Sequence, residues 1–152
     1  GFSATYLNGE KVEREIRDRE VSDNVSPVST IAGVRARLVE LQRSLGAGGG
    51  VVMDGRDIGT VVFPAARLKI FMTARPEVRA QRRYLELVSK GLPADFDAVM
   101  KNISERDRID SSREVSPLRQ ADDAVVLDNS DMTPEEQMVW FRELYKKRIN
   151  ES

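Results

Sequence analysis

A chain of 152 residues with 24 Lys and Arg against 25 Asp and Glu has a formal net charge of −1, so no global positive field attracts nucleic acid. It contains neither Cys nor His, which excludes thiol and imidazole nucleophiles, disulfides and thiolate metal sites, and we expect no metal site made of its side chains. The chain is 40% hydrophobic and has no apolar run near the ~18 residues of a membrane span, so we expect a soluble cytoplasmic domain, or a domain with a small subdomain.

The first 45 residues predict a hairpin followed by two helices. Asn8-Gly9 lies between short semi-apolar arms and favours the type I′ turn of a hairpin. After Asp18, a possible helix cap, valines recur at helical spacing at positions 21, 25 and 28. Ser29 or Thr30 is a candidate cap for the next helix. The core-facing stripe of that helix is predicted to be Ile31, Val34, Leu38, Leu41 and Leu45.

The remainder of the chain alternates between predicted strands and helices. The glycine-rich stretch 46–50 predicts a flexible joint. Nearly continuous apolar runs predict three strands buried on both faces, at 51–53, 68–72 and 124–127. Helix starts are predicted at Pro76, at Asp95 and at the capping box Thr133-Pro134-Glu135-Glu136. This alternation is typical of an α/β chain with a parallel sheet.

Polar residues follow the first predicted strand directly, in the stretch Asp54-Gly55-Arg56-Asp57-Ile58-Gly59-Thr60. In an α/β sheet the carboxyl edge, where such a strand ends, is where ligands bind. The stretch therefore offers a guanidinium between carboxylates at a candidate site. The structural alternative is a turn in which Arg56 pairs with a neighbouring Asp.

A second group of charges lies near the end of the helix that begins at Asp95. Arg106, Asp110 and Arg113 stand at i, i+4 and i+7, so they share one face. Two donors with an acceptor between them suit a phosphorylated polyol, because arginine favours multidentate phosphate recognition. The alternative is a set of ordinary solvated helix pairs worth ~0.3 kcal/mol each.

A third group is the arginine stripe of the helix that begins at Pro76. Arg79, Arg82 and Arg83 stand at i, i+3 and i+4 and could bind an anion together. Glu77 and Glu86 lie nearby, so surface pairing is the alternative interpretation.

In this order and spacing the motifs resemble those of bacterial cytidylate kinase, a nucleoside monophosphate kinase. The start of that family's monophosphate-binding insert is similar to Leu7-Asn8-Gly9-Glu10 and Glu15-Ile16-Arg17. Its core motif resembles the stretch from Asp54 to Pro64, and its last strand the stretch from Ala124 to Asp128. The segment after its lid resembles Glu105-Arg106-Asp107 with Asp110 and Arg113.

The resemblance implies an α/β fold that is part of a P-loop NTPase-like parallel sheet flanked by helices. Residues 1–47 would form the helical monophosphate-binding insert, and residues 48–152 the rest of the kinase core, with a short lid at about 80–96. No G-x-x-x-x-G-K-[ST] motif occurs in the chain. We therefore expect the N-terminal core with its phosphate loop to be absent, and the chain alone to be inactive.

The resemblance also implies a role for each site residue. Ser26 and Arg35 would read the cytosine edge, and Arg113 would approach the base from the core side. Arg56 would bind the monophosphate, Asp57 would be a carboxylate at the nucleotide site, and Asp110 would accept from ribose hydroxyls. The transferred phosphoryl group would be bound by Arg106 together with Arg82 or Arg83 from the lid.

The implied reaction moves the γ-phosphoryl group of ATP to CMP or dCMP, giving CDP or dCDP. Mg²⁺ would be held mainly through the nucleotide phosphates and the absent N-terminal part. We expect no nucleic-acid or membrane partner and a monomeric complete enzyme, whereas this chain would self-associate or retain an N-terminal piece. Three alternatives remain open: a non-catalytic nucleotide- or anion-binding module, another nucleoside monophosphate kinase, and a structural α/β domain whose charges are solvated faces.

Overall fold

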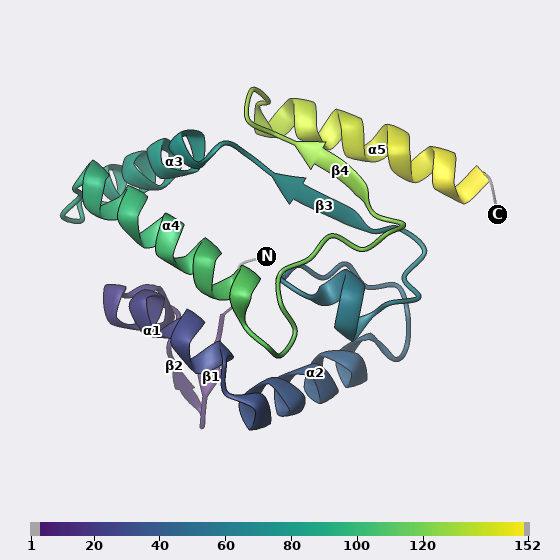
Figure 1. Ribbon diagram of the computed structural model, residues 1–152, viewed down its shortest axis with the longest axis horizontal. Helices are drawn as coiled ribbons and strands as arrows, with labels where there is room; N and C mark the ends of the chain where they lie inside the picture. The colour runs from purple at the N-terminus through teal and green to yellow at the C-terminus, as the bar shows by residue number, and fades with distance from the viewer. Residues whose placement is uncertain (1–3, 151–152) are drawn as a thin grey trace.

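The computed structural model describes residues 4–150, apart from the side chains of Arg17, Arg19 and Ile149. Figure 1 shows the N-terminal helices below, the strands β3 and β4 with α5 above and to the right, and the pair α3 and α4 on the left. The elements in chain order are β1 (Tyr6–Leu7), β2 (Glu10–Lys11), the 3₁₀ turn η1 (Glu15–Arg17), α1 (Arg19–Ser29), α2 (Ala32–Gly46), the π-helical turn η2 (Ile58–Val62), β3 (Ile70–Thr73), α3 (Pro76–Ser89), α4 (Phe96–Ser112), β4 (Val125–Asp128) and α5 (Pro134–Asn150).

The N-terminal hairpin is confirmed. β1 and β2 pair antiparallel, with Leu7 opposite Glu10. Asn8 and Gly9 between them have φ values of 51° and 87°, as a type I′ turn requires. Asn and Gly are the residues that adopt left-handed φ at least cost, so this turn is a local consequence of two residue types.

Helix α2 begins at Ala32, which is later than either predicted N-cap, Ser29 or Thr30, would place its start. Its N-cap is Ile31, so the prediction of Ser29 or Thr30 as cap is wrong. Ser29 Oγ donates to the carbonyl of Ser26 at 2.7 Å, and Thr30 Oγ1 donates to that of Pro27 at 2.8 Å. Both hydroxyls therefore close the end of α1, whose last carbonyls lack intrahelical partners.

The apolar stripe of α2 does not face the core. Leu38, Leu41 and Leu45 are exposed, and the buried residues of the helix are Arg35 and Val39. A helix stripe is buried only where another apolar surface meets it. Within residues 4–150, α2 meets mainly η2 and α1, and those contacts take up a different face.

Two of the three predicted strands form, but neither is buried on both faces as predicted, because Met72 of β3 and Val126 of β4 are 58% and 47% exposed. β3 and β4 pair parallel, in a register that sets Ile70 against Val125 and Thr73 against Asp128. The predicted strand at 51–53 is wrong: these residues pair with no strand of the described chain, and Val52 is 94% exposed. An apolar run becomes a strand only when a neighbour completes its hydrogen-bond ladder, and here no described strand does so.

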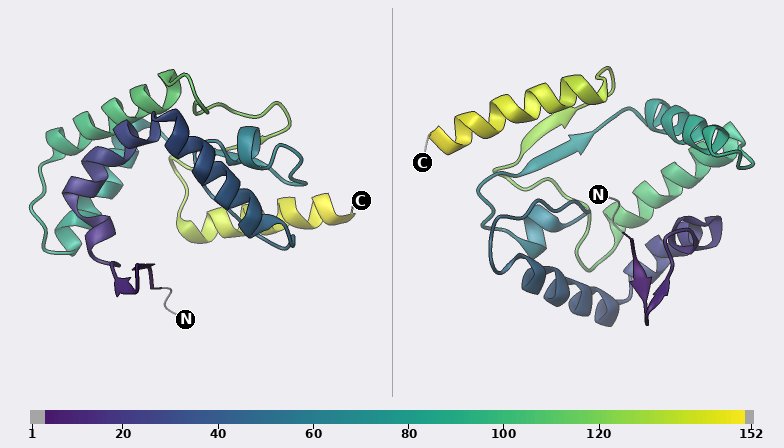
Figure 2. Two further views of the ribbon diagram at one scale, coloured as in Figure 1. Left: turned by 90° about the horizontal axis from the view of Figure 1, so that it is seen from below. Right: turned by 180° about the vertical axis from the view of Figure 1, so that it is seen from behind.

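The three later helices start as their sequence signals predict. Pro76 is the first residue of α3, and Asp95 Oδ1 accepts from the backbone N–H of Ala98 at 2.7 Å at the start of α4. Before α5, Thr133 Oγ1 accepts from Glu136 N at 3.2 Å and Glu136 Oε2 accepts from Thr133 N at 2.7 Å, which is a complete capping box. The right-hand view of Figure 2 shows α5 running alongside the β3–β4 pair.

Helices α3 and α4 form a packed pair that returns the chain from the end of β3 toward the site. Ala80 on α3 and Val99 on α4 are buried, and the rings of Tyr84 and Phe96 meet edge to face at 6.2 Å. The last two turns of α4 carry the charged residues predicted for the site. Within residues 4–150 no helix is both long and apolar enough to cross a membrane.

Candidate functional site

Five polar side chains predicted for the site are buried. Their exposed fractions lie between 3% and 8%, and the residues are Ser26, Arg35, Asp57, Asp110 and Arg113. They come from the last turns of α1, the first turns of α2, the residue before η2 and the end of α4. Charged side chains are seldom buried unless they are paired, so the contacts within this cluster decide whether it is stable.

The first pair of the cluster joins α2 to the residue that precedes η2. Arg35 Nη2 donates to Asp57 Oδ2, and both side chains are at least nine-tenths buried. The backbone carbonyl of Asp57 accepts from Val61 N at 2.8 Å, which begins the π-helical turn. Arg43 on α2 closes that turn, because its guanidinium donates to the carbonyls of Val61 and Val62 at 2.6 and 3.2 Å. Two arginines of α2 thus hold Asp57 and η2 in place.

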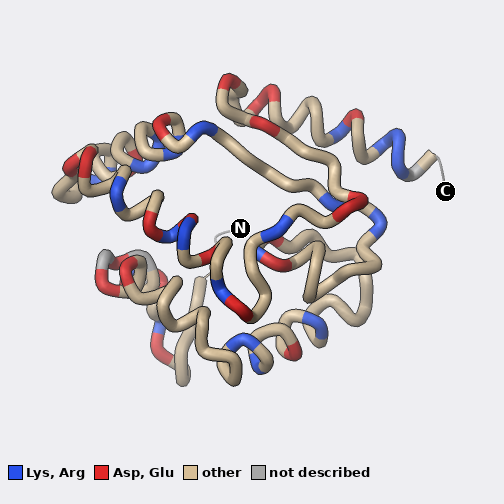
Figure 3. Tube along the Cα trace, viewed as in Figure 1, with Lys and Arg blue, Asp and Glu red and all other residues tan. Residues whose placement is uncertain are grey.

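Asp110 is the second carboxylate of the cluster and lies between two arginines. Arg56 Nε donates to its Oδ2 at 2.8 Å, and Arg113 Nη1 lies 3.7 Å from its Oδ1. Arg56 is itself 47% exposed in its side chain, so this pair reaches from the buried cluster to the surface. Figure 3 shows positive and negative residues alternating along the part of α4 that carries these groups.

Arg113 is held by groups that the sequence analysis did not assign to the site. Its Nε donates to the carbonyl of Ser116 at 2.6 Å, and its Nη1 donates to Ser29 Oγ at 3.0 Å. Burial, followed by the nearby charge of Arg35, lowers the pKa of the Arg113 guanidinium from its ordinary value. Arginine nevertheless stays protonated in proteins, so an anionic or electron-rich ligand beside it would be favourable.

Ser29 and Ser116 could not be assigned from sequence for different reasons. Ser29 carries a helix-cap signal, which masks its contact with a residue 84 positions away. Ser116 contributes a backbone carbonyl, which every residue possesses, and its φ of 52° is unusual for a residue other than glycine. No residue type signals either contact.

Two guanidinium nitrogens of this cluster, and one of Arg106 outside it, are buried without partners, unlike those of an ordinary ion-pair network. Among the described residues, no hydrogen-bond acceptor reaches Arg35 Nε, Arg106 Nε or Arg113 Nη2. A buried donor that has lost water without gaining an acceptor costs ~1–3 kcal/mol. The three nitrogens are therefore candidate donors to a bound molecule that carries acceptor oxygens or ring nitrogens.

The arginines predicted for the lid are engaged elsewhere. Arg82 donates to the side chain and backbone oxygens of Asn129 at 3.0 and 2.7 Å, beyond the end of β4. Arg83 pairs with Glu86 at 2.9 Å, three residues along α3. Neither has a described hydrogen bond to the buried cluster. Arg79, the third member of the stripe, binds Asp107 of α4 through both terminal nitrogens, at 3.0 and 2.6 Å.

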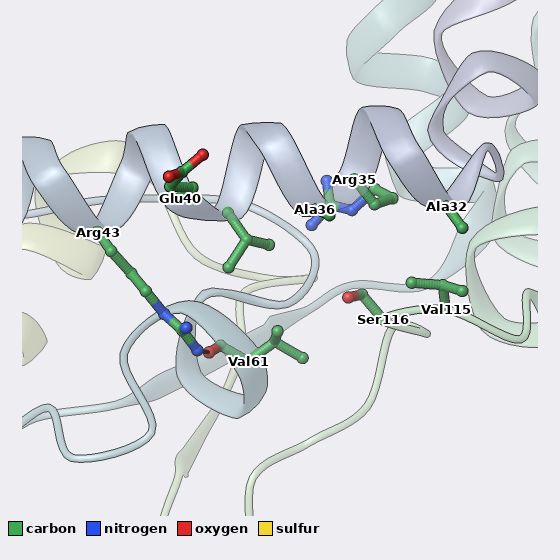
Figure 4. A pocket seen from close by; sticks show the side chains of 9 residues that line it. Ala32, Arg35, Ala36, Glu40, Arg43, Val61, Val115 and Ser116 are labelled. Atoms are coloured by element: carbon green, nitrogen blue, oxygen red, sulfur yellow. Dashed lines mark hydrogen bonds between the residues drawn. The ribbon is translucent and has the colours of Figure 1, made fainter.

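A groove of about 420 Å³ runs beside the cluster. Figure 4 shows that it lies between one face of α2, Val61 and the loop at 115–116, with Arg35 and Ser116 on its walls. Its lining is mostly apolar, so a flat, largely apolar group with polar edges would fit there better than a bare anion. Within residues 4–150 no three carboxylates gather to hold a metal ion.

Fold and site together define the class of protein: an α/β chain with a parallel pair of strands and a buried cluster of arginines and carboxylates. A family model described as cytidylate kinase matches residues 1–145. The chain belongs to the cytidylate kinase family.

Three relatives show how much of the family's length is present. A cytidylate kinase from Parabacteroides distasonis is 62% identical over 98% of this chain and 65% of that protein. Those from Phocaeicola vulgatus and Porphyromonas gingivalis are 56% and 57% identical, over 96% and 97% of this chain and 64% of each relative. The chain thus spans just under two thirds of the length of the curated relatives it matches.

Proposed function

We propose that this chain is the monophosphate-binding and lid-bearing part of a cytidylate kinase, which transfers the γ-phosphoryl group of ATP to CMP or dCMP. Membership of the family and three relatives named cytidylate kinase support the activity. Residues 1–47 are proposed as the insert, residues 48–152 as core, and about 80–96 as lid, on a P-loop NTPase-like sheet of which β3 and β4 are two strands. The loop between α3 and α4 falls inside this lid.

The observation that carries the proposal is the pair of buried, unpartnered donors Arg35 Nε and Arg113 Nη2. Cytosine presents N3 and O2 as acceptors and the N4 amino group as a donor. Two fixed donors meet the acceptors, and Ser26, also buried in the cluster, is proposed to complete the reading of the edge. Uracil offers N3–H where cytosine offers an acceptor, so it would leave a buried donor unpaired.

The remaining groups suit a ribose and a phosphate. Asp110 is an acceptor for ribose hydroxyls, and its bond from Arg56 Nε keeps that carboxylate oriented. The described contacts of Arg56 use only Nε, so its two terminal nitrogens can bind the monophosphate of a nucleotide. Asp57, paired with Arg35, keeps that guanidinium in place beside the base.

Phosphoryl transfer requires positioned reactants and cations around the equatorial oxygens of the transferred group, and it does not require a covalent intermediate. Arg106, whose buried Nε has no described hydrogen-bond acceptor, is proposed to bind the transferred group. Arg82 or Arg83 would join it after leaving the contacts with Asn129 or Glu86, which makes lid closure part of the reaction. Mg²⁺ would arrive on the nucleotide phosphates and reduce their negative charge.

Isothermal titration of the 152-residue chain with CMP, UMP and inorganic phosphate tests the proposal. We expect CMP to bind more tightly than UMP, and both more tightly than phosphate, because base and ribose contacts add to those of the phosphate. Absence of CMP binding at millimolar concentration would refute the proposal. Equal affinity for phosphate and CMP would instead favour an anion-binding module.

A further inference from the structure

Ser29 connects α1 to α4 through a single hydroxyl group. Its Oγ donates to the carbonyl of Ser26 at 2.7 Å and accepts from Arg113 Nη1 at 3.0 Å. A serine hydroxyl has one proton. Because that proton points to the carbonyl in a hydrogen bond, a lone pair of the oxygen faces the guanidinium. The two bonds are therefore compatible, and together they tie Arg113 to the turn that carries Ser26.

The contact with Ser29 restrains the direction in which Arg113 presents its free nitrogen. The guanidinium is planar, with Nε bound to the Ser116 carbonyl, Nη1 bound to Ser29 and Nη2 buried without a partner. Two anchors on different nitrogens of a rigid plane fix the third. Asp110 Oδ1 cannot replace Ser29, because at 3.7 Å from Nη1 it lies outside hydrogen-bond range.

We propose that Ser29 is a positioning residue for base recognition, although it does not contact the base. It fixes Arg113 of the core and Ser26 of the insert relative to each other, so that both side chains contact the base of the nucleotide together. The inference rests on the proposed function and deepens it, because it assigns the selectivity of that site to a contact between insert and core. Without Ser29, Arg113 would keep its charge and its Ser116 anchor but could turn Nη2 away from the base.

Ser44 provides a matched control. Its Oγ donates to the carbonyl of Leu41, three residues earlier in α2, at 2.7 Å, just as Ser29 does in α1. That serine is exposed, and its Oγ has no described bond to a distant side chain. Ser29→Ala and Ser44→Ala thus lose the same local bond, and only the first also loses the contact with Arg113.

The experiment measures CMP and UMP dissociation constants by calorimetry for the wild-type chain and three variants, with thermal unfolding of each. We expect Ser29→Ala to weaken CMP binding about tenfold, the typical value of one hydrogen bond to a charged group, and to weaken UMP binding less. Ser44→Ala should stay within about twofold of wild type for both nucleotides. Ser29→Thr, which keeps the hydroxyl, should restore the CMP preference.

Each alternative outcome separates the two proposals. If the wild-type chain binds no CMP, the proposed function fails and Ser29 has no such role. If it prefers CMP and Ser29→Ala keeps both affinity and preference, only the inference about Ser29 is overturned. Equal losses for CMP and UMP would show a purely structural role and overturn it as well. Should Ser29→Ala fail to fold, Ser29→Cys, nearly equal in size but a weak acceptor, takes its place with the same expected result.

Discussion

Asp57 and Arg35 are buried together, so each depends on the other for compensation of its charge. We predict that Asp57→Asn lowers the free energy of unfolding by ~3–5 kcal/mol, because it leaves a buried guanidinium uncompensated. Asp131→Asn is the matched control: it breaks the pair with Arg75, whose side chain is 53% exposed, and should cost far less, because water screens an exposed ion pair. Urea unfolding of both variants measures the difference, and equal losses would contradict the account of the cluster.

Arg106 is predicted to contribute to catalysis rather than to folding. In an enzyme of the full length of its relatives, Arg106→Ala should lower kcat roughly a thousandfold, by analogy with arginine fingers, because a cation at the transferred group is lost. Arg108→Ala, on the same helix and in an exposed pair with Glu105, should leave kcat near wild type. A coupled assay compares the two, and near-normal turnover of Arg106→Ala would refute the assigned role.

Helix α5 begins with a capping box that contains a titratable group, the carboxyl of Glu136. The N–H of Thr133, with the Thr133 side chain as second cause, holds the pKa of Glu136 below its ordinary value. A carboxyl with a lowered folded pKa adds stability above its unfolded pKa, near 4.3, and loses that contribution as pH falls through the folded value. We predict that Glu136→Gln reduces the loss of stability between about pH 5 and pH 3, as measured by thermal unfolding. An unchanged pH dependence would contradict this.

One arginine of α3, Arg79, bonds to α4 and stabilises the packing of these two helices. Arg79 uses both terminal nitrogens on Asp107 and its Nε on the carbonyl of Ala74 at 3.1 Å, so it joins α3, α4 and the residue after β3. We predict that Arg79→Lys costs ~1–2 kcal/mol although the charge is kept, because an ammonium cannot form this planar fork. Arg108→Lys, in an exposed pair, should leave the free energy of unfolding nearly unchanged when both variants are compared by urea unfolding.

The whole molecule exposes apolar surface that a parallel sheet normally buries. Met72 on β3 and Val126 on β4 are 58% and 47% exposed, and the leucine stripe of α2 is exposed as well. Parallel strands are found almost only with both faces covered. We predict that the isolated chain self-associates or binds a further polypeptide across this surface. Size exclusion with light scattering tests this, and a monodisperse 17.1 kDa species that unfolds cooperatively would contradict it.

The isolated chain is also predicted not to turn over ATP and CMP. Its sequence has no G-x-x-x-x-G-K-[ST] stretch, whose backbone N–H groups and lysine would cradle the phosphates of ATP. A coupled assay with ATP, Mg²⁺ and CMP measures this directly. Turnover of 1–100 s⁻¹, the usual range for kinases, would show that another part of the chain performs that task.

The sequence by itself determined the features that depend on neighbouring residues. Asn8-Gly9 specified its turn through φ values that few other residues adopt, and Thr133 with Glu136 specified a helix start through two bonds spanning three residues. The spacing of Arg106 and Asp110 predicted a shared face of α4 because the period of a helix is local, whereas Arg113 follows the last helical residue with extended backbone, so the helix period does not place it. The motifs that resemble those of cytidylate kinases could also be identified from the sequence alone, because each is a short run of neighbouring residues.

Only the tertiary structure decided which distant groups meet. The stretch 51–53 is apolar enough for a strand, yet it forms none because strand formation requires a partner ladder that no described residue offers. Ser29 has the residue type of a cap, yet it binds Arg113 because α1 and α4 are packed together. Periodicity and propensity describe energies over a few residues, whereas burial and long-range pairing depend on surfaces that exist only after the chain has folded.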